Sequence, residues 1–363
     1  MSSLFEPLTL RSVTLANRVV VSPMCQYSAE DGSANDWHLA HLGQLALSGA
    51  GLLITEATHV SAVGRITPHC LGLYSDANEA ALGRVLRFMR QHGSGAIGVQ
   101  LAHAGRKAAS SVPWEGGGPL SDGAWPVVGA SPIAFAPGWH VPRELDADGL
   151  AEVKAEFVAA AQRADRLGID VIELHGAHGY LLHSFLSPLS NRRGDGYGGS
   201  RANRMRFPLE VFEAVRTVFP ADKPVGIRIS ASDHVEGGWS LDDSIALAHE
   251  LKSLGADFID VSSGGMSPDQ KITVGPGYQV AYAGAIRRET GLVSMAVGMI
   301  DQPHQAETII RDGSADLVAL ARGFLRNPRW VWDAADALGA EAHAPPQYAR
   351  VRPSSRSTAP SRR

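Results

Sequence analysis

The sequence has only two cysteines, Cys25 and Cys70, in 363 residues. Two thiols are too few for a disulfide framework or for the ligands of an iron–sulfur cluster. The rest of the composition is ordinary, with 44% hydrophobic and 19% charged residues. A chain of this length and composition can bury a large core without disulfides or metals. We therefore expect a globular protein that is held together by packing.

An excess of charge of either sign is also missing. The 33 lysines and arginines nearly balance the 37 aspartates and glutamates, giving a net charge of −4, and no basic face is obvious. Neither nucleic acid nor a membrane surface is therefore expected as a partner. The N-terminus lacks a basic flank followed by an apolar core, and no apolar run approaches the roughly 20 residues that cross a bilayer. We expect a cytoplasmic protein.

Two motifs for cofactors and metals are absent as well. No G-x-G-x-x-G lies on a strand–helix turn, so a Rossmann domain for a nicotinamide nucleotide is not indicated. His175 and His178 are three residues apart, but neither a suitable third ligand nor the glutamate of a zinc protease accompanies them. No metal site is predicted.

The chain does contain a repeated order of apolar run, loop and amphipathic helix. The apolar runs lie at 19–22, 52–56, 97–101, 171–174, 225–229, 258–261, 293–297 and 317–320. Helical patterns lie near 37–49, 76–92, 148–167, 201–218, 240–254, 278–290, 302–312 and 328–338. Eight units of strand then helix, with no antiparallel signal between them, predict an α/β fold of the (β/α)8 TIM-barrel type. The barrel is expected to form one domain over residues 1–350, with an N-terminal hairpin.

Several helix starts are marked by their residue types. Asp148, Ser240 and Asp301 are typical N-cap residues, and Pro303 falls in a first turn. These residues predict where three of the helices begin.

One connection, which includes residues 113–145 after the third strand, is unusually long. Loops of this length are usually functional or disordered. Its aromatic residues favour an ordered excursion, and they are Trp114, Trp125, Phe135 and Trp139. We expect it to cap the barrel mouth, and a purely structural excursion is a close alternative. The polar, basic tail 351–363 is expected to be disordered.

The stretch from Glu173 to Phe207 concentrates polar chemistry after the fourth strand. Its residues His175, His178 and Tyr180 would lie where the carboxyl end of a strand opens into a loop, which is where barrel enzymes carry out chemistry. Taken alone, an H-x-x-H pair is structural in about half of cases.

Other strand ends carry further candidate residues. Arg228 interrupts the apolar strand PVGIRIS, and a buried arginine must be functional or paired in a structural salt bridge. Gln100 ends the third strand and offers a donor and an acceptor, although it could simply cap a loop. The ends of the last two strands, at Gly298 and at Ala321-Arg322, are places where barrels often bind phosphate.

These segments resemble the Old Yellow Enzyme family of flavin-dependent ene-reductases. HGAHGYLLHSFLSP, NRRGDGYGGS and RANRMRF occur in order and at family spacing, and the resemblance extends from about Phe5 to Arg350. The C-x-Y pair at Cys25 and Tyr27 is similar to the bacterial, thermophilic-like or class III branch. The resemblance implies a TIM barrel with tightly bound FMN and with NADPH as hydride donor in the pocket later used by the substrate. The low cysteine content separates the chain from the larger cluster-bearing relatives.

The resemblance also implies roles for individual residues. His175 and His178 would hold the activating oxygen of an electron-poor alkene, and Tyr180 would protonate the α-carbon, because a phenol keeps its proton at neutral pH. Tyr27 would contact the substrate, and Cys25 would tune the flavin potential. The cofactor-binding positions implied are Ser22, Pro23, Met24, Cys25, Ala57, Gln100, Arg228, Gly298, Ala321 and Arg322.

The C-terminal segment Gln347-Tyr348-Ala349-Arg350 resembles a class III feature whose arginine reaches into a neighbouring active site. The resemblance implies that Arg350 binds substrate and that the enzyme is a homodimer or homotetramer. An aromatic residue often follows in relatives, whereas Val351 follows here.

Two other functions remain open. A phosphate-binding barrel isomerase or aldolase would use a lysine or carboxylate inside a strand, for which Glu56 and Glu173 are candidates, and would be colourless. A non-catalytic flavin-binding redox sensor would use Cys25 as a switch and would not reduce alkenes. Neither explains the His-x-x-His-x-Tyr arrangement as well as an ene-reductase does. The sequence does not identify the physiological alkene or distinguish NADPH from NADH.

Overall fold

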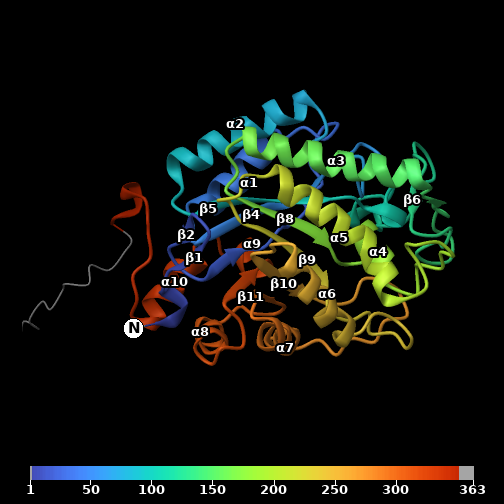
Figure 1. Cartoon of the computed structure of the whole chain (residues 1–363). Coiled ribbons are helices and arrows are strands. Elements are labelled where there is room, and N and C mark those ends of the chain that lie inside the picture. The colour runs from blue at the N-terminus through green and yellow to red at the C-terminus, as the bar shows by residue number, and fades with distance from the viewer. Residues whose placement is uncertain (1, 351–363) are drawn as a thin grey trace, which may run out of the picture.

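A closed barrel of parallel strands forms the centre of the computed structural model, which describes residues 2–350 (Figure 1). The strands follow one another around the barrel in chain order. They are β3 (Val19–Val21), β4 (Leu52–His59), β5 (Ala96–Ala102), β8 (Val171–Gly176), β9 (Val225–Ser230), β10 (Phe258–Ser262), β11 (Val293–Val297) and β12 (Leu317–Leu320). The predicted (β/α)8 barrel is confirmed.

Helices surround the barrel, and every helix predicted from the periodicity is present (Figure 1). They are α1 (Asp36–Ala46), α2 (Asp76–His92), α3 (Ala147–Arg166), α5 (Arg201–Val218), α6 (Leu241–Ser253), α7 (Val280–Thr290), α8 (Pro303–Arg311) and α10 (Trp330–Leu338). Two short helices, α4 (Leu181–Leu186) and α9 (Arg322–Arg326), were not predicted because they are too short for a periodic pattern. Within residues 2–350, no helix is long and apolar enough to cross a bilayer.

The predicted helix starts are partly wrong. Ser240 is the N-cap of α6 and forms a capping box with Asp243, as expected. The side chain of Asp146, rather than that of Asp148, caps α3. The N-cap residue of α8 is Gln302, rather than Asp301, and Pro303 follows it in the first turn. At α3, Asp146 and Asp148 are both of cap type, so residue type alone could not choose between them, and at α8 the N-cap residue makes no side-chain cap hydrogen bond.

Side chains on the barrel strands alternate between the interior and the helix layer. Buried apolar residues fill the amino-terminal part of the interior, and they include Val20, Leu52, Ile54, Val171, Phe258, Met295 and Leu317. We call this cluster the plug. Polar residues follow two positions later on several strands: Ser22 after Val20, Glu173 after Val171 and Asp260 after Phe258. The alternation therefore places polar groups inside the barrel above the plug.

The N-terminal hairpin closes the amino-terminal end of the barrel. It consists of β1 (Leu8–Leu10) and β2 (Val13–Leu15), which pair antiparallel as predicted. Leu10 and Leu15 are buried members of the plug.

The excursion over residues 113–145 is structured. It contains the short parallel pair β6 (Val128–Gly129) and β7 (Arg143–Glu144). Trp125 donates to the Val63 carbonyl, and the Phe135 ring lies 4.4 Å from Lys107 Nζ. Trp114 is 68% exposed, and its ring contacts that of Tyr27 edge to face, with the centroids 6.0 Å apart. The role of the excursion as a cap stays a prediction, and the tail 351–363 lies outside the described residues.

Candidate active site

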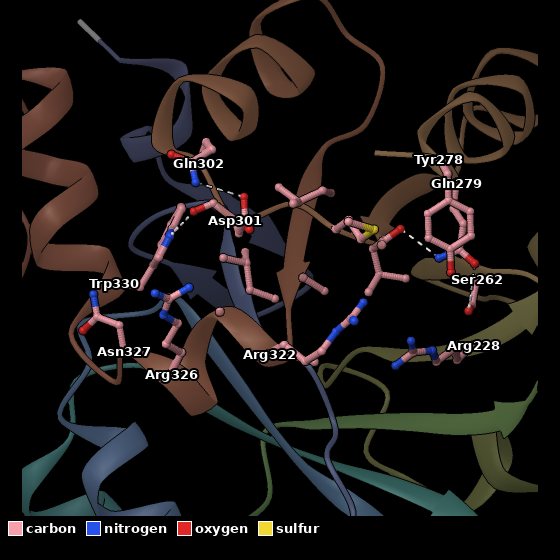
Figure 2. A pocket seen from close by; sticks show the side chains of 18 of the residues that line it. Arg228, Ser262, Tyr278, Gln279, Asp301, Gln302, Arg322, Arg326, Asn327 and Trp330 are labelled. Atoms are coloured by element: carbon pink, nitrogen blue, oxygen red, sulfur yellow. Dashed lines mark hydrogen bonds between the residues drawn. The ribbon is translucent and has the colours of Figure 1, made fainter. Parts of the chain in front are cut away.

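A cavity of about 810 Å³ opens where β9 to β12 end (Figure 2). This volume lies in the range of pockets that hold cofactors and small ligands. One end is lined by His178, Arg228, Ser262 and Gln279. The other end is lined by residues 298–302 and 321–323 and by Arg326, Asn327 and Trp330. Among residues 2–350, no three histidine, cysteine or acidic side chains are placed to hold a metal ion.

The second end of the cavity suits a phosphate. Arg322 and Arg326 project from α9 towards it, and Ala321 directly precedes that helix (Figure 2). Gly298 has a φ of 116°, and a Cβ there would meet Gln279 Nε2 at 2.7 Å. Glycine is therefore needed for the backbone to line this part of the cavity. Arg326 was missed in the sequence, although its spacing of four residues from Arg322 places both on one face of a helix.

Arg228 reaches the first end of the cavity from inside the barrel. It is only 8% exposed, and its Nη1 donates to Ser22 Oγ at 3.0 Å. Its Nε lies 3.4 Å from the Asp260 carboxylate. The side chain therefore has a buried anionic partner and also lines the cavity (Figure 2).

Gln100 lies inside β5, not at its end, because the strand continues to Ala102. Its Nε2 donates to Glu173 Oε1 at 2.7 Å across the β5–β8 pair. Gln100 is 2% exposed, so it is a barrel-interior residue rather than the cap of a loop.

The remaining predicted cofactor positions come from β3 and β4. The chain leaves β3 through Ser22, and the next residues Pro23, Met24 and Cys25 are half-buried. Ala57 lies within β4, at a register shift against β5, and is buried. Burial raises the pKa of the Cys25 thiol well above its usual value, and the nearby Glu56 adds to this shift.

The two histidines lie close together near the mouth. His175 belongs to β8 rather than to the following loop. Its Nε2 lies 3.4 Å from His178 Nδ1, and the two rings are nearly perpendicular at 5.2 Å. Burial lowers the pKa of both imidazoles, and the nearby Arg228 lowers them further. Both side chains are therefore neutral at physiological pH.

The neighbours of these rings define which nitrogens carry protons. The Ala177 N–H donates to His175 Nδ1 at 3.3 Å, which leaves the ring proton on Nε2. Ser262 Oγ lies 2.7 Å from His178 Nε2 and also 3.3 Å from Gln279 Oε1. Because the Ser262 hydroxyl donates to Gln279, the His178 Nε2–H donates to Ser262, and His178 Nδ1 carries no proton. The His175 Nε2–H then points to His178 Nδ1 at 3.4 Å, so the two rings and Ser262 form a chain of contacts that ends at Gln279.

Tyr180 lies beside the histidine pair. Its ring is 4.9 Å from that of His175, edge to face. Burial raises the pKa of its phenol well above the usual value, and Cys25 contributes further. None of the hydrogen bonds found within residues 2–350 involves its hydroxyl, so a neutral O–H is available to a ligand.

Lys107 contacts the histidine and tyrosine group, whereas the neighbouring Arg106 and His103 are buried away from it. Its Nζ donates to the His178 carbonyl at 2.9 Å and lies 5.2 Å from the Tyr180 ring. Burial lowers the pKa of Lys107 to about 8, and Arg106 adds to the shift. Arg106 is 4% exposed and donates to the Met266 carbonyl, and His103 is 2% exposed. Both are interior residues.

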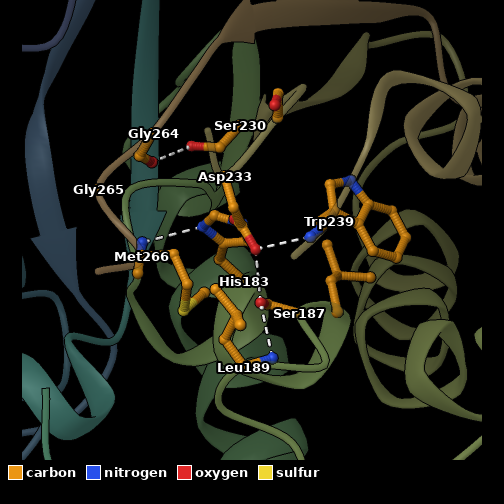
Figure 3. A network of polar contacts seen from close by, with 12 residues as sticks. His183, Ser187, Leu189, Ser230, Asp233, Trp239, Gly264, Gly265 and Met266 are labelled. Atoms are coloured by element: carbon orange, nitrogen blue, oxygen red, sulfur yellow. Dashed lines mark hydrogen bonds and ion pairs between the residues drawn. The ribbon is translucent and has the colours of Figure 1, made fainter. Parts of the chain in front are cut away.

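A buried network holds the turn between the histidines and the tyrosine (Figure 3). His178 and Gly179 both have positive φ, 58° and 77°. The Gly179 N–H donates to His183 Nδ1 at 2.9 Å, and His183 Nε2 lies 3.0 Å from Asp233. Asp233 also accepts from the Ser187 hydroxyl and the Trp239 N–H, at 2.6 and 2.7 Å. The network lowers the pKa of Asp233 against the effect of its burial.

Tyr27 and Arg350, the other two predicted substrate-binding residues, make no hydrogen bond to His175, His178 or Tyr180 within residues 2–350. Tyr27 is half-buried and shares a small apolar cluster with Cys25 and Tyr180. Arg350 is exposed in the segment after α10, and within residues 2–350 none of its contacts reaches the barrel mouth. A role for Arg350 in a neighbouring subunit stays a prediction.

The fold and the cavity are those of a barrel enzyme with a site that suits a phosphate group at the ends of its last strands. The family model for the NADH:flavin oxidoreductase / NADH oxidase family matches residues 3–341. The chain is 46% identical over 349 residues to an NADPH dehydrogenase of Geobacillus sp. (strain WCH70), covering 96% of this chain and 98% of that protein. It is 45% identical over 353 residues to an NADPH dehydrogenase of Listeria innocua serovar 6a, covering 97% and 99%.

A solved structure of morphinone reductase in complex with tetrahydroNAD superposes with a TM-score of 0.77 at 30% identity, covering 95% of this chain and 93% of that one. The chain belongs to the NADH:flavin oxidoreductase / NADH oxidase family, that of Old Yellow Enzyme. It is a flavin oxidoreductase that uses FMN and a nicotinamide nucleotide.

The residues of the cavity fit FMN. Arg322 and Arg326 offer charged donors for its phosphate, and Gly298 and Ala321 leave the backbone accessible beside them. At the other end, Arg228 offers a donor to the polar edge of the ring system. The side-chain oxygen of nearby Gln100 has no partner within residues 2–350 and can accept a hydrogen bond.

Proposed function

We propose that the protein is an FMN-dependent ene-reductase that reduces the C=C bond of α,β-unsaturated carbonyl, nitro or imide compounds. FMN, when bound, would carry hydride from NADPH to the β-carbon of the alkene in a ping-pong order, so that NADP⁺ would leave before the alkene binds. The grouping of His175 and Tyr180 around His178, which lines the cavity, carries the proposal.

In this proposal His175 and His178 bind the activating oxygen of the alkene. Two N–H donors that converge on one oxygen withdraw electron density from the conjugated bond and stabilise the negative charge that develops on that oxygen. The lowered pKa values keep both rings neutral, so their donor pattern is constant around neutral pH. Binding in this way requires the His178 proton on Nδ1, with the Ser262 hydroxyl turned from Gln279 to His178 Nε2.

Tyr180 is the proposed acid. Its raised pKa keeps the proton on the hydroxyl until a carbanion-like α-carbon accepts it. Burial of the ring against His175 fixes its distance from the bound oxygen. Tyr27, on the same side, would contact the body of the substrate.

The two alternative functions find less support. Glu56 accepts from the Gln26 N–H and faces His38, and Glu173 is fully buried against Gln100, so neither carboxyl lines the cavity as a catalytic base would. The raised pKa of Cys25 keeps the thiol protonated, which is unfavourable for a thiol-based redox switch.

An absorbance spectrum of the purified protein tests the proposal directly. We expect a yellow protein that bleaches with NADPH under anaerobic conditions and regains its colour when 2-cyclohexenone is added. A flavin that NADPH bleaches and no activated alkene restores would favour the redox sensor. A protein that stays colourless after FMN is added would point to the phosphate-binding isomerase or aldolase.

A further inference from the structure

Four polar side chains form a buried layer beneath the cavity, and the proposed reaction uses none of their carboxyl groups. We call this layer the floor. It consists of Gln100 from β5, Glu173 from β8, Arg228 from β9 and Asp260 from β10, with exposed fractions of 2%, 0%, 8% and 0%. The plug lies on one side of the floor, and His175 follows Glu173 two positions later on β8.

The strand register brings the floor residues into contact. Gln100 is opposite Glu173, and Arg228 is opposite Asp260. Gln100 donates to Glu173 at 2.7 Å, and Arg228 Nε is 3.4 Å from Asp260 Oδ2. The two carboxyl groups are within hydrogen-bonding reach of each other.

Three carboxyl oxygens in this layer accept no hydrogen bond within residues 2–350: Glu173 Oε2 and both oxygens of Asp260, of which Oδ2 has only the 3.4 Å ion pair with Arg228. A buried acceptor without a donor is costly, and two neighbouring carboxylates beside one guanidinium would leave an excess negative charge away from water. One proton between the two carboxyl groups removes both problems, because it supplies a donor and leaves one anion for Arg228.

We propose that Glu173 and Asp260 hold one proton between them, and that this pair positions Gln100 and Arg228 and sets the charge beneath the cofactor. The part that concerns the cofactor rests on the proposed placement of FMN over the floor. Glu173 occupies the amide nitrogen of Gln100, which turns the amide oxygen towards a ligand. Asp260 lies near Arg228 Nε and Ser22 accepts from Arg228 Nη1, while the side chain still lines the cavity (Figure 2).

The direction of the titration follows from burial. The pKa of Glu173 is raised to about 8, first by burial and then by the nearby Asp260, while Arg228 and Gln100 oppose the shift. Burial also raises the pKa of Asp260, which Arg228 opposes. Gln100 on β5 and Ser22 on β3 contribute no charge. The floor is therefore neutral overall below about pH 8 and gains one negative charge above it.

That charge affects both the protein and the cofactor. The proton is bound in the folded state and absent from an unfolded glutamate, so folding stability is fully present below the unfolded pKa and declines as pH rises through about 8. A new negative charge beneath the flavin also opposes the negative charge that the ring system gains on reduction. The reduction potential of the bound flavin should therefore become more negative above this pH than the flavin alone requires.

Glu173→Gln is the matched test, because an amide can donate to Asp260 and accept from Gln100 as the protonated acid does. The infrared band of a protonated carboxyl should be present in the full-length protein at about pH 6, disappear by about pH 10, and be absent from the variant. The FMN dissociation constants of both proteins should agree at about pH 6. That of the unmodified protein should rise by up to about tenfold per pH unit above about pH 8, and that of the variant should not.

Asp260→Asn provides a second test of the shared proton if Glu173→Gln folds poorly. With the anion removed, Glu173 faces Arg228 alone and should ionise, so the infrared band should be lost at about pH 6 although the glutamate is retained. Exposed Glu115 offers a control, since Glu115→Gln should leave the band and its titration unchanged.

The inference is overturned if the band is missing from the unmodified protein at about pH 6, if it persists in Glu173→Gln, or if the pH dependence of FMN binding is the same in both proteins. The infrared measurement can be made after FMN is removed. A protein that shows the band but binds no FMN would refute the proposed function and leave the carboxyl pair intact.

Discussion

The two ends of the cavity are built differently. At the histidine end, other protein groups hold each part: Ser262 contacts His178, Lys107 binds the His178 carbonyl, and His183 accepts from Gly179. At the arginine end, neither Arg322 nor Arg326 has a hydrogen bond or ion pair to another residue within 2–350. Catalysis requires donors that are fixed before the substrate arrives, whereas charged side chains can gather around a phosphate when it binds.

The largest expected effect lies at the fixed end. His175→Ala combined with His178→Ala should lower the rate of alkene reduction by at least about 10³-fold, because both donors to the developing oxyanion are lost. Bleaching of the flavin by NADPH should be largely retained. Stopped-flow measurement of the two steps checks this, and an equal loss in both would contradict the polarising role.

Tyr180→Phe should slow alkene reduction by about 10²-fold while the affinity for the alkene changes little, because the ring remains and only the acid is lost. The rate of the alkene step and the dissociation constant of a substrate analogue should be measured together. An unchanged rate with a cyclic enone would identify water or another residue as the acid.

The network behind the turn should give a smaller effect. His183→Leu leaves the Gly179 N–H unpaired and removes one donor from Asp233, so the free energy of unfolding should fall by about 2 kcal/mol. The alkene step should slow more than flavin bleaching. His183→Gln, which can still donate to Asp233, is the control and should recover part of both losses. Chemical denaturation and stopped-flow kinetics measure them.

The smallest effect is expected at the arginine end. Arg322→Ala or Arg326→Ala should each weaken FMN binding by about tenfold, since one charge-assisted contact is lost and the other remains. The rate of the fully loaded enzyme should be unchanged. Fluorescence titration of FMN at low and high salt checks this, and a loss of rate at saturating FMN would mean that this end also positions the reacting ring.

The sequence was sufficient to predict the elements of the fold that depend on a local pattern of residues. Short continuous apolar runs predicted the barrel strands, and the alternation of side chains along a strand places Ser22, Gln100, His175 and Arg228 inside. The end of β8 was underestimated by two residues, because a polar residue such as His175 does not look like a strand residue, whereas the predicted run 97–101 differs from β5 by one residue at each end.

Long-range partners could not be predicted. The contact of Ser262 with His178 joins residues that are 84 positions apart, and that of Asp260 with Arg228 joins neighbouring strands. Ser262 and Asp260 lie in FIDVSSG, which reads as an ordinary buried strand. Arg326 was missed because α9 has only 5 residues and gives no periodic signal.

The plug and the N-terminal hairpin close the amino-terminal end of the barrel, so that only its carboxyl-terminal end is open. Leu10 and Leu15 seal the end opposite the cavity, so nothing can enter from one side and leave from the other. The nicotinamide donor and the alkene would then enter through the same opening, and each would have to dissociate before the other could bind. We expect this order of events to follow from the architecture of the barrel itself, whichever alkene the enzyme uses.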